Sequence, residues 1–181
     1  MNVIVFLADG FELVEAMCPI DMLRRAGAEV VTVSISDTEK VTSAQGVAVM
    51  ADASLASLDG PLPDLVFLPG GMPGASHLRE NAKVCDMTAA VFSRGGYVAA
   101  ICAAPFILGE LGLLRGKTAT CYPGFEESLI GATLSDRKVV RDGNVITAAG
   151  MGAALPFAAE LVAALYGRDK ASTLLETIQT P

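Results

Sequence analysis

Residues 97–105 read YVAAICAAP, an apolar run that reaches a cysteine and continues with small residues. The first five residues have the composition of a buried strand, and the residues after Cys102 (AAPFILGELGLL, 103–114) are typical of a helix. Two interpretations of Cys102 are open at this point. Either it is a free cysteine buried as a small apolar residue, or a strand ends here, turns tightly and lifts the sulfur onto the N-terminus of a helix.

The same alternation of apolar strands and periodic helices extends along the whole chain. We expect strands over 2–8, 29–36, 65–70 and 97–101, a hairpin or other excursion over 41–55, further short segments at 118–122 and 139–149, and helices over 15–27, 81–96, 104–114, 153–166 and 168–179. Continuous apolar strands separated by helices predict a mainly parallel sheet with helices on both faces. The prediction is therefore one doubly wound α/β domain over residues 1–181.

Composition excludes several classes of function. The chain has 181 residues, 52% of them hydrophobic, which is enough for one core of good size. Its formal net charge is −7, and no cluster of lysine and arginine with interleaved aromatic residues offsets that charge. Such a surface repels phosphate backbones, so we expect no nucleic-acid partner.

The start of the chain argues against secretion and against a membrane partner. The stretch MNVIVFLADGFELVEA is apolar but soon carries Asp9, Glu12 and Glu15, and it lacks the basic start and long apolar centre of a signal peptide. No uninterrupted apolar run reaches the roughly 18 residues that a membrane span needs. We therefore expect a soluble, cytoplasmic protein.

The cysteines and the histidine indicate a site without a metal. Cys18, Cys85, Cys102 and Cys121 lie far apart and form no CxxC pair, so in a reducing compartment they are expected to be free thiols. His77 is the single histidine of the chain, which makes a structural metal cluster less plausible still. We expect neither a metal nor another cofactor.

Three segments whose residues could take part in catalysis follow three of the expected strands. They are DGFELVEA (9–16), PGGMPG (69–74) and the cysteine turn ICAA (101–104). Because ligands of such sheets lie beyond the carboxyl ends of the strands, these segments are expected to meet at one edge. The N–H groups of Gly70, Gly71 and Ala103 could then form an oxyanion hole, and ICAA would stand where a nucleophile elbow carries its serine. Taken alone, the glycine pair is equally an ordinary turn.

A cysteine at such a turn is sensitive to its surroundings. A helix N-terminus lowers the pKa of a thiol, whereas a nearby carboxylate raises it. If Glu15 lies beside Cys102, the two groups are expected to share one proton. A protonated Glu15 that donates to a Cys102 thiolate would supply a nucleophile and a proton carrier without a histidine.

Four segments resemble the ThiJ/PfpI superfamily, in the branch that contains the parkinsonism-associated protein deglycase and glyoxalase III. They are LADGFELVEA, MLRRAGAEV, LPGGMPGA and AAICAAP, and ADASL and RDGNVITAAGMG extend the likeness over essentially the whole chain. The resemblance implies a flavodoxin-like sandwich and, in this branch, an obligate homodimer with Cys18 on the helix at the interface.

The resemblance also assigns roles. Cys102 matches the reactive cysteine, Glu15 the glutamate that hydrogen-bonds the sulfur, and Gly71 and Ala103 the positions whose N–H groups line the oxyanion pocket. The implied activity is that of a cofactor-independent glyoxalase III or deglycase, in which the thiolate attacks a 2-oxoaldehyde such as methylglyoxal on the way to lactate. The alternative is an oxidative-stress sensor or redox-dependent chaperone that uses oxidation of the same Cys102 to sulfinate, and a binding module with a silent site is a third possibility.

Several positions depart from the pattern of the family. Tyr122 stands where many relatives carry a histidine; it can hydrogen-bond a substrate oxygen but is a poor base at neutral pH. Gln45 replaces an arginine of some relatives, and Gly150-Met151-Gly152 replaces their glycine–proline–glycine turn. The protease branch carries a histidine directly after its cysteine, where this chain has Ala103, so peptidase activity is not expected. These departures affect the expected rate and substrate more than the expected fold.

Overall fold

The central element of the structure, a computed structural model that describes residues 1–180, is a seven-stranded sheet. In spatial order its strands are β10 (Val139–Asp142), β11 (Val145–Ala148), β7 (Tyr97–Ile101), β6 (Leu65–Leu68), β1 (Asn2–Leu7), β2 (Glu29–Ser34) and β5 (Ala53–Ser54). All neighbours are parallel except β10, which pairs antiparallel with β11 across the Asp142–Gly143 turn. The predicted mainly parallel α/β sheet is confirmed.

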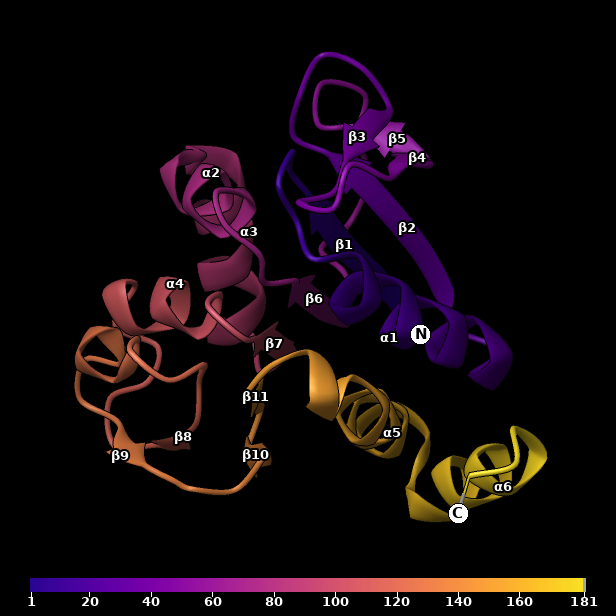
Figure 1. The fold of residues 1–181 in the computed structure, drawn as a ribbon, viewed down its shortest axis with the longest axis vertical. Helices are drawn as coiled ribbons and strands as arrows, with labels where there is room; N and C mark the ends of the chain where they lie inside the picture. The colour runs from indigo at the N-terminus through magenta and orange to yellow at the C-terminus, as the bar shows by residue number, and fades with distance from the viewer. Residues whose placement is uncertain (181) are drawn as a thin grey trace.

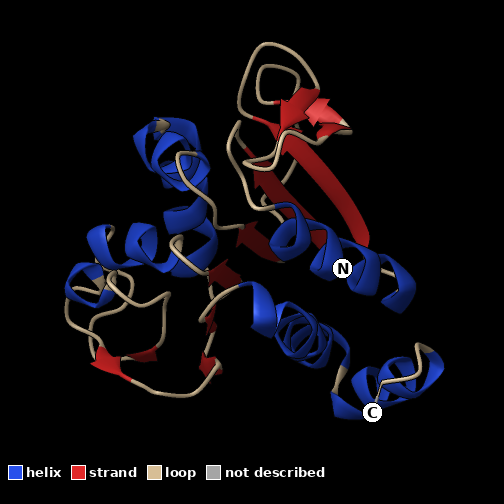
Figure 2. Ribbon diagram, viewed as in Figure 1, coloured by secondary structure: helices blue, strands red, loops and turns tan. Residues whose placement is uncertain are grey.

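Helices cover both faces of this sheet (Figures 1 and 2). The helices of one face are α1 (Leu13–Ala26), α5 (Ala154–Tyr166) and α6 (Arg168–Thr177), and those of the other are α2 (Gly74–Glu80), α3 (Ala82–Ser93) and α4 (Pro105–Glu110). Successive side chains of a strand point to opposite faces. Val3, Val5 and Leu7 of β1 therefore pack in the core under α1, α5 and α6, while the residues between them pack in the core under α2, α3 and α4. Within residues 1–180, no helix has the length and apolar content needed to cross a membrane.

The register of the three central strands determines where the loops meet. In the pairing of β1 with β6, Val5 lies opposite Phe67, and in the pairing of β6 with β7, Phe67 lies opposite Ala99. The carboxyl ends of β1, β6 and β7 therefore lie side by side. The segments that follow them, 8–12, 69–73 and 102–104, leave from adjacent strands at the edge where ligands of such sheets bind.

The largest differences from the sequence prediction among the helices are at α2 and α4. The chain forms a short helix, α2, where the sequence suggested only a turn followed by one helix over 81–96; its N-cap, Pro73, makes no side-chain hydrogen bond, so the usual start signal is missing. In addition, α4 begins at Pro105 and ends at Glu110, not at residue 114. Gly109 within α4 lies against the backbone of Ser128, where an added Cβ would not fit.

The predicted excursion over 41–55 contains a hairpin that holds the loop after β1 in place. Its strands are β3 (Lys40–Thr42) and β4 (Ala48–Met50), paired antiparallel. The N–H of Thr42 donates to Asp9 Oδ1 at 2.7 Å, and the N–H of Gly10 donates to the carbonyl of Thr42 at 2.8 Å. Because these bonds fix both ends of the short turn at residues 9–10, the hairpin orients the entry into α1. A second excursion carries the parallel pair β8 (Thr118–Ala119) and β9 (Thr133–Leu134).

Candidate active site

Cys102 occupies a sharp turn between β7 and α4. Its φ of 64° is in the left-handed region, which is unusual for a residue with a side chain. The N–H of Cys102 donates to the carbonyl of Ala148 at 2.8 Å, and Ala103 and Ala104 are buried. Small neighbours permit this cramped path, while the cysteine itself remains partly exposed. The strained backbone at a partly exposed nucleophile is the geometry of a nucleophile elbow.

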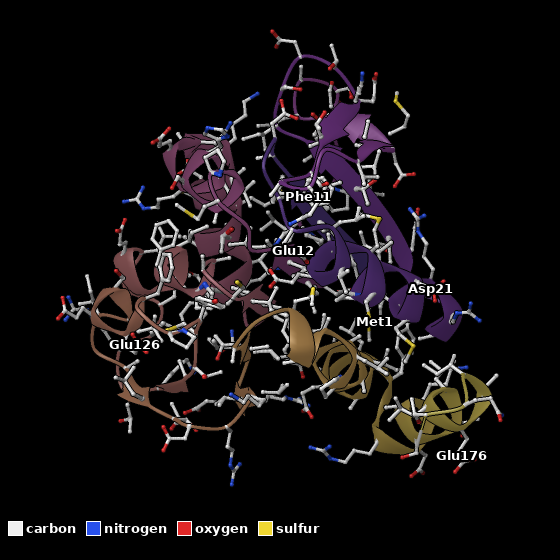
Figure 3. All side chains as sticks on the ribbon, viewed as in Figure 1. Met1, Phe11, Glu12, Asp21, Glu126 and Glu176 are labelled. Carbon is white, nitrogen blue, oxygen red and sulfur yellow. The ribbon has the colours of Figure 1, made fainter. Side chains whose placement is uncertain are left out.

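Glu15 is buried in the first turn of α1, with only 1% of its surface exposed. Helix α1 begins two residues earlier than predicted, and its N-cap is Glu12, whose Oε2 accepts the N–H of Glu15 at 2.7 Å. Figure 3 shows Glu12 at this start of α1, toward the centre of the molecule. The cap fixes the turn that carries the Glu15 carboxyl beneath the loops from β6 and β7.

Two glycines allow the loops to approach one another. A Cβ on Gly70 would collide with Glu15 Oε2 and would lie 2.5 Å from Cys102 Cβ and 2.8 Å from the carbonyl oxygen of Ile101. Gly71 has a φ of 86°, and a Cβ there would lie 2.6 Å from the carbonyl oxygen of Gly10. Side chains are therefore excluded at both positions. The structure thus brings together Glu15, Gly70, Gly71 and Cys102, as the sequence predicted.

Burial is the main influence on the pKa of Glu15, which lies beside Cys102. It raises the pKa of the Glu15 carboxyl from its ordinary value of 4.5 to about 7, with a smaller contribution from the charge of Glu12, while hydrogen bonds from Cys102 and from the N–H groups of Gly70 and Met151 act in the opposite direction. At neutral pH, therefore, Glu15 is poised between its charged and neutral forms.

The thiol responds differently from the sequence expectation. Burial, followed by the charge of Glu15 and its hydrogen bond, raises the pKa of Cys102 to about 12, and the N–H groups of Ala103 and Gly71 offset only part of that increase. The expected lowering by a helix N-terminus does not prevail, because burial and the charge of Glu15 outweigh the nearby backbone N–H groups. Since the two groups share a proton, the steps near 7 and 12 belong to the pair, which holds one proton between them.

One oxygen of Glu15 remains available. Its Oε2 is buried and has no hydrogen-bond partner of good geometry within residues 1–180. Buried acceptors are nearly always paired in folded proteins, so an unpaired one marks a place where another group can bind. Here the available acceptor belongs to the carboxyl group beside the cysteine, where it can take a proton from a reacting molecule.

Tyr122 is tied to the site through its backbone and lines it with its ring. The N–H of Tyr122 donates to the carbonyl of Cys102 at 2.8 Å. Its half-exposed ring lies against Gly150, and the next residue, Met151, donates its N–H to Glu15. The sequence reasoning noted the Gly150–Gly152 turn only as a departure from the family pattern and missed the contact of Met151 with Glu15.

The remaining candidates lie farther from the pair. The Nδ1 atom of His77, on α2, is 3.2 Å from the carbonyl oxygen of Asp9, so this histidine supports the loop before α1. Gln45 is exposed in the turn of the β3–β4 hairpin. Cys85 and Cys121 are buried, and burial raises the pKa of Cys18, which is partly exposed on α1. In the part of the chain that the structure describes, no three His, Cys, Asp or Glu side chains are grouped as a metal site would require.

Replacing Glu12 with glutamine is expected to shift the pH dependence of Cys102 reactivity. The glutamine oxygen can still cap α1, but the negative charge that raises the pKa of Glu15 is gone. The first proton of the pair then leaves at lower pH, so alkylation of Cys102 by iodoacetamide should begin at a lower pH than in the wild type. Mass spectrometry of the Cys102 peptide across a pH series measures the onset. An onset at the wild-type pH or above it would show that Glu12 acts only as a cap.

Comparisons with known proteins give a consistent set of relatives. The model described as the DJ-1/PfpI family matches residues 1–164. Protein dj-1beta of Drosophila melanogaster is 37% identical over 171 residues, which cover 93% of this chain and 91% of that protein. A deglycase of Pyrococcus abyssi is 35% identical over 149 residues, which cover 81% of this chain and 89% of that protein. Among solved structures, oxidized Toxoplasma gondii DJ-1 aligns with a TM-score of 0.94 and 36% identity over 98% of this chain and 97% of that one.

Proposed function

Because the chain belongs to the DJ-1/PfpI family, we propose that it is a cofactor-independent enzyme of the glyoxalase III or deglycase type that acts on 2-oxoaldehydes through Cys102. The motif resemblance to the family is thereby confirmed. The observation that carries the proposal is the pairing of an elbow cysteine with a buried glutamate whose pKa is about 7. The deglycase of Pyrococcus abyssi among the relatives is consistent with this activity.

The proposed reaction begins with addition to the aldehyde. The Cys102 sulfur forms a bond to the aldehyde carbon, and the carbonyl oxygen gains the proton that the pair holds, which gives a hemithioacetal. While negative charge develops on that oxygen, the N–H groups of Gly71 and Ala103 are available to stabilise it, since both already lower the pKa of the neighbouring thiol. Gly70 contributes by leaving room for the carboxyl group.

Glu15 performs the second part of the proposed reaction. Its carboxylate removes the proton from the former aldehyde carbon and returns it to the neighbouring carbon, while the hydroxyl proton of the hemithioacetal passes to the ketone oxygen. The first carbon is thereby oxidised to a thioester and the ketone is reduced to an alcohol. Water then cleaves the thioester and restores the thiol. The sum is one 2-oxoaldehyde and one water giving one 2-hydroxycarboxylic acid. A proton carrier works best when its pKa is close to the operating pH.

Turnover of methylglyoxal tests the proposal. We expect the wild-type chain to convert many equivalents to lactate, and Cys102→Ser and Glu15→Gln each to lose roughly 10²–10⁴-fold in kcat. Cys18→Ser is the matched control, because it removes another partly exposed thiol and should leave the rate unchanged. Multiple turnovers by Cys102→Ser would contradict the proposed mechanism.

A second candidate, an oxidative-stress sensor or redox-dependent chaperone, is favoured by one observation: Cys102 is partly exposed on a strained turn. Cys85 and Cys121 are buried, and the other partly exposed thiol, Cys18, lies within helix α1. Two equivalents of hydrogen peroxide would oxidise the Cys102 thiol to sulfinate, with water as the reduced product. Peptide mass spectrometry after mild peroxide distinguishes the candidates. Removal of no more than one equivalent of methylglyoxal, together with oxidation confined to Cys102, would favour the sensor; uniform oxidation of all four cysteines would oppose it.

A homodimer is the proposed assembly, with a small aldehyde as the substrate. Supporting apolar exposure occurs at Val14 on α1 and at Met50 on β4, which is 70% exposed. Exposed apolar side chains of this kind, methionine above all, are enriched on surfaces that another chain covers. Sedimentation of the wild-type chain and of Val14→Glu tests this, since a charge at an interface should shift the population toward monomer.

A further inference from the structure

We infer that a pocket beside the reactive pair, bounded by Tyr122 and Met151, selects 2-oxoaldehydes that carry an aromatic or branched apolar substituent. This inference rests on the proposed function and specifies its substrate class. The pocket has a volume of about 570 Å³. We call it the Tyr122–Met151 pocket; its lining consists of Tyr122, Pro123, Lys138, Ala149, Gly150, Met151, Gly152 and Ala153.

The pocket adjoins both reacting groups through residues of its wall. A Cβ on Gly150 would lie 3.2 Å from Cδ2 of Tyr122 and 3.9 Å from Oε1 of Glu15. A single glycine backbone therefore separates the ring from the carboxyl group. On the other side, the N–H of Tyr122 donates to the carbonyl of Cys102. Tyr122 and Gly150 of the pocket wall thus contact the residues that carry the two reacting groups, so the second substituent of a substrate attached to the Cys102 sulfur lies next to this pocket.

The lining is mainly apolar and half-exposed. Tyr122 is 50% exposed and Met151 is 55% exposed, and alanine, glycine and proline complete most of the remaining wall. Lys138 is the charged side chain among the lining residues. An aromatic ring gains by stacking against tyrosine and by contact with a methionine thioether. Such a wall offers little to a substrate that ends in a methyl group.

The size of the pocket supports the same class. Its volume falls in the range of roughly 300–1,000 Å³ that small-molecule sites occupy, so a phenyl group fits, whereas the methyl of methylglyoxal leaves most of it empty. One methylene in an apolar pocket changes specificity by about 10–200-fold. We therefore expect kcat/KM for phenylglyoxal to exceed that for methylglyoxal by about tenfold or more.

The first experiment measures the ratio of the two kcat/KM values in variants of the wall. Tyr122→Ala and Met151→Ala should each lower the ratio of phenylglyoxal to methylglyoxal by about tenfold, while Tyr122→Phe keeps the ring and with it the ratio. Leu134→Ala is the matched control, since it removes a similarly exposed apolar side chain from β9, outside the lining of the pocket. Equal values for the two aldehydes in the wild type, or a ratio unchanged by both alanine variants, would overturn the inference.

The second experiment separates this inference from the proposed function. Mandelate and lactate are the acids that the proposed reaction would form from phenylglyoxal and methylglyoxal, and NMR measures their binding without any turnover. Tighter binding of mandelate that is lost in Tyr122→Ala supports the pocket even if neither aldehyde is consumed, in which case only the proposed function fails. Turnover of both aldehydes with equal binding of the two acids would leave the function standing and reject the pocket. Equal binding abolished in Lys138→Met would likewise reject it, because the pocket would then recognise the carboxylate.

Discussion

Between about pH 5.5 and pH 8, the wild-type chain is expected to lose up to about 2 kcal/mol of stability relative to the Glu15→Gln variant. The folded chain holds the proton of Glu15 with a pKa of about 7, whereas the unfolded chain releases it near 4.5. A raised carboxyl pKa means that the folded state is favoured while the group is protonated. That contribution is complete below pH 4.5 and is lost as the pH rises through 7.

Urea denaturation of both chains at the two pH values measures this effect. Any loss of a hydrogen bond in the glutamine variant is the same at both pH values and cancels in the difference. Glu127→Gln serves as the control, because Glu127 is exposed and its replacement should give a difference that does not change with pH. A Glu15→Gln difference that stays constant, or that favours the wild type more at pH 8, would contradict the assignment of a buried, protonated glutamate.

Gly70→Ala is expected to reduce turnover of a 2-oxoaldehyde by about a hundredfold, the size of effect that follows when a catalytic group moves by about 1 Å. The added methyl group must displace the Glu15 carboxyl, the Cys102 side chain or the backbone of Ile101. Two of these three obstacles are the reacting groups themselves. Overpacking of this kind also costs roughly 1–3 kcal/mol of stability.

A second glycine near the site, Gly152, provides the control for Gly70→Ala. Gly152 has no neighbour within 4 Å of an added Cβ, and its backbone is not in the left-handed region. Gly152→Ala should therefore keep the stability of the wild type, and because Gly152 only lines the Tyr122–Met151 pocket, any change in the rate on methylglyoxal should fall far short of a hundredfold. Kinetics on methylglyoxal and thermal unfolding of the two variants provide the test. If Gly70→Ala behaved like Gly152→Ala, the close packing between Glu15 and Cys102 would have to be wrong.

The central strands could be predicted from the sequence because each is a short, continuous apolar run bounded by turn residues. The same reasoning placed Glu15, Gly70 and Cys102 at the ends of three strands, and a parallel sheet brings such ends together. Their order in the sheet, with β1, β6 and β7 adjacent at its centre, is what makes the three segments neighbours. For these elements local pattern and overall topology agree.

Features that depend on how deeply a side chain is buried could not be predicted in the same way. The sequence suggested a thiol with a lowered pKa, but burial outweighs the backbone N–H groups and raises it. The residues next to Glu15 in the sequence do not indicate that this carboxyl is almost fully buried. The short helix α2 was missed for a local reason, because it follows a glycine- and proline-rich stretch without a capping side chain.

The two ends of the central sheet limit how copies of this chain can associate. At one end β5 has only two residues, Ala53 and Ser54. At the other, the Asp142 carboxylate of β10 accepts the N–H of Thr118 at 2.8 Å, so the β8 segment lies against that strand. A long, flat strand with free N–H and C=O groups is what templates edge-to-edge pairing and fibrous aggregates. Within residues 1–180, neither outermost strand of the central sheet presents such a template, which protects a concentrated solution from growth by strand addition at these two ends.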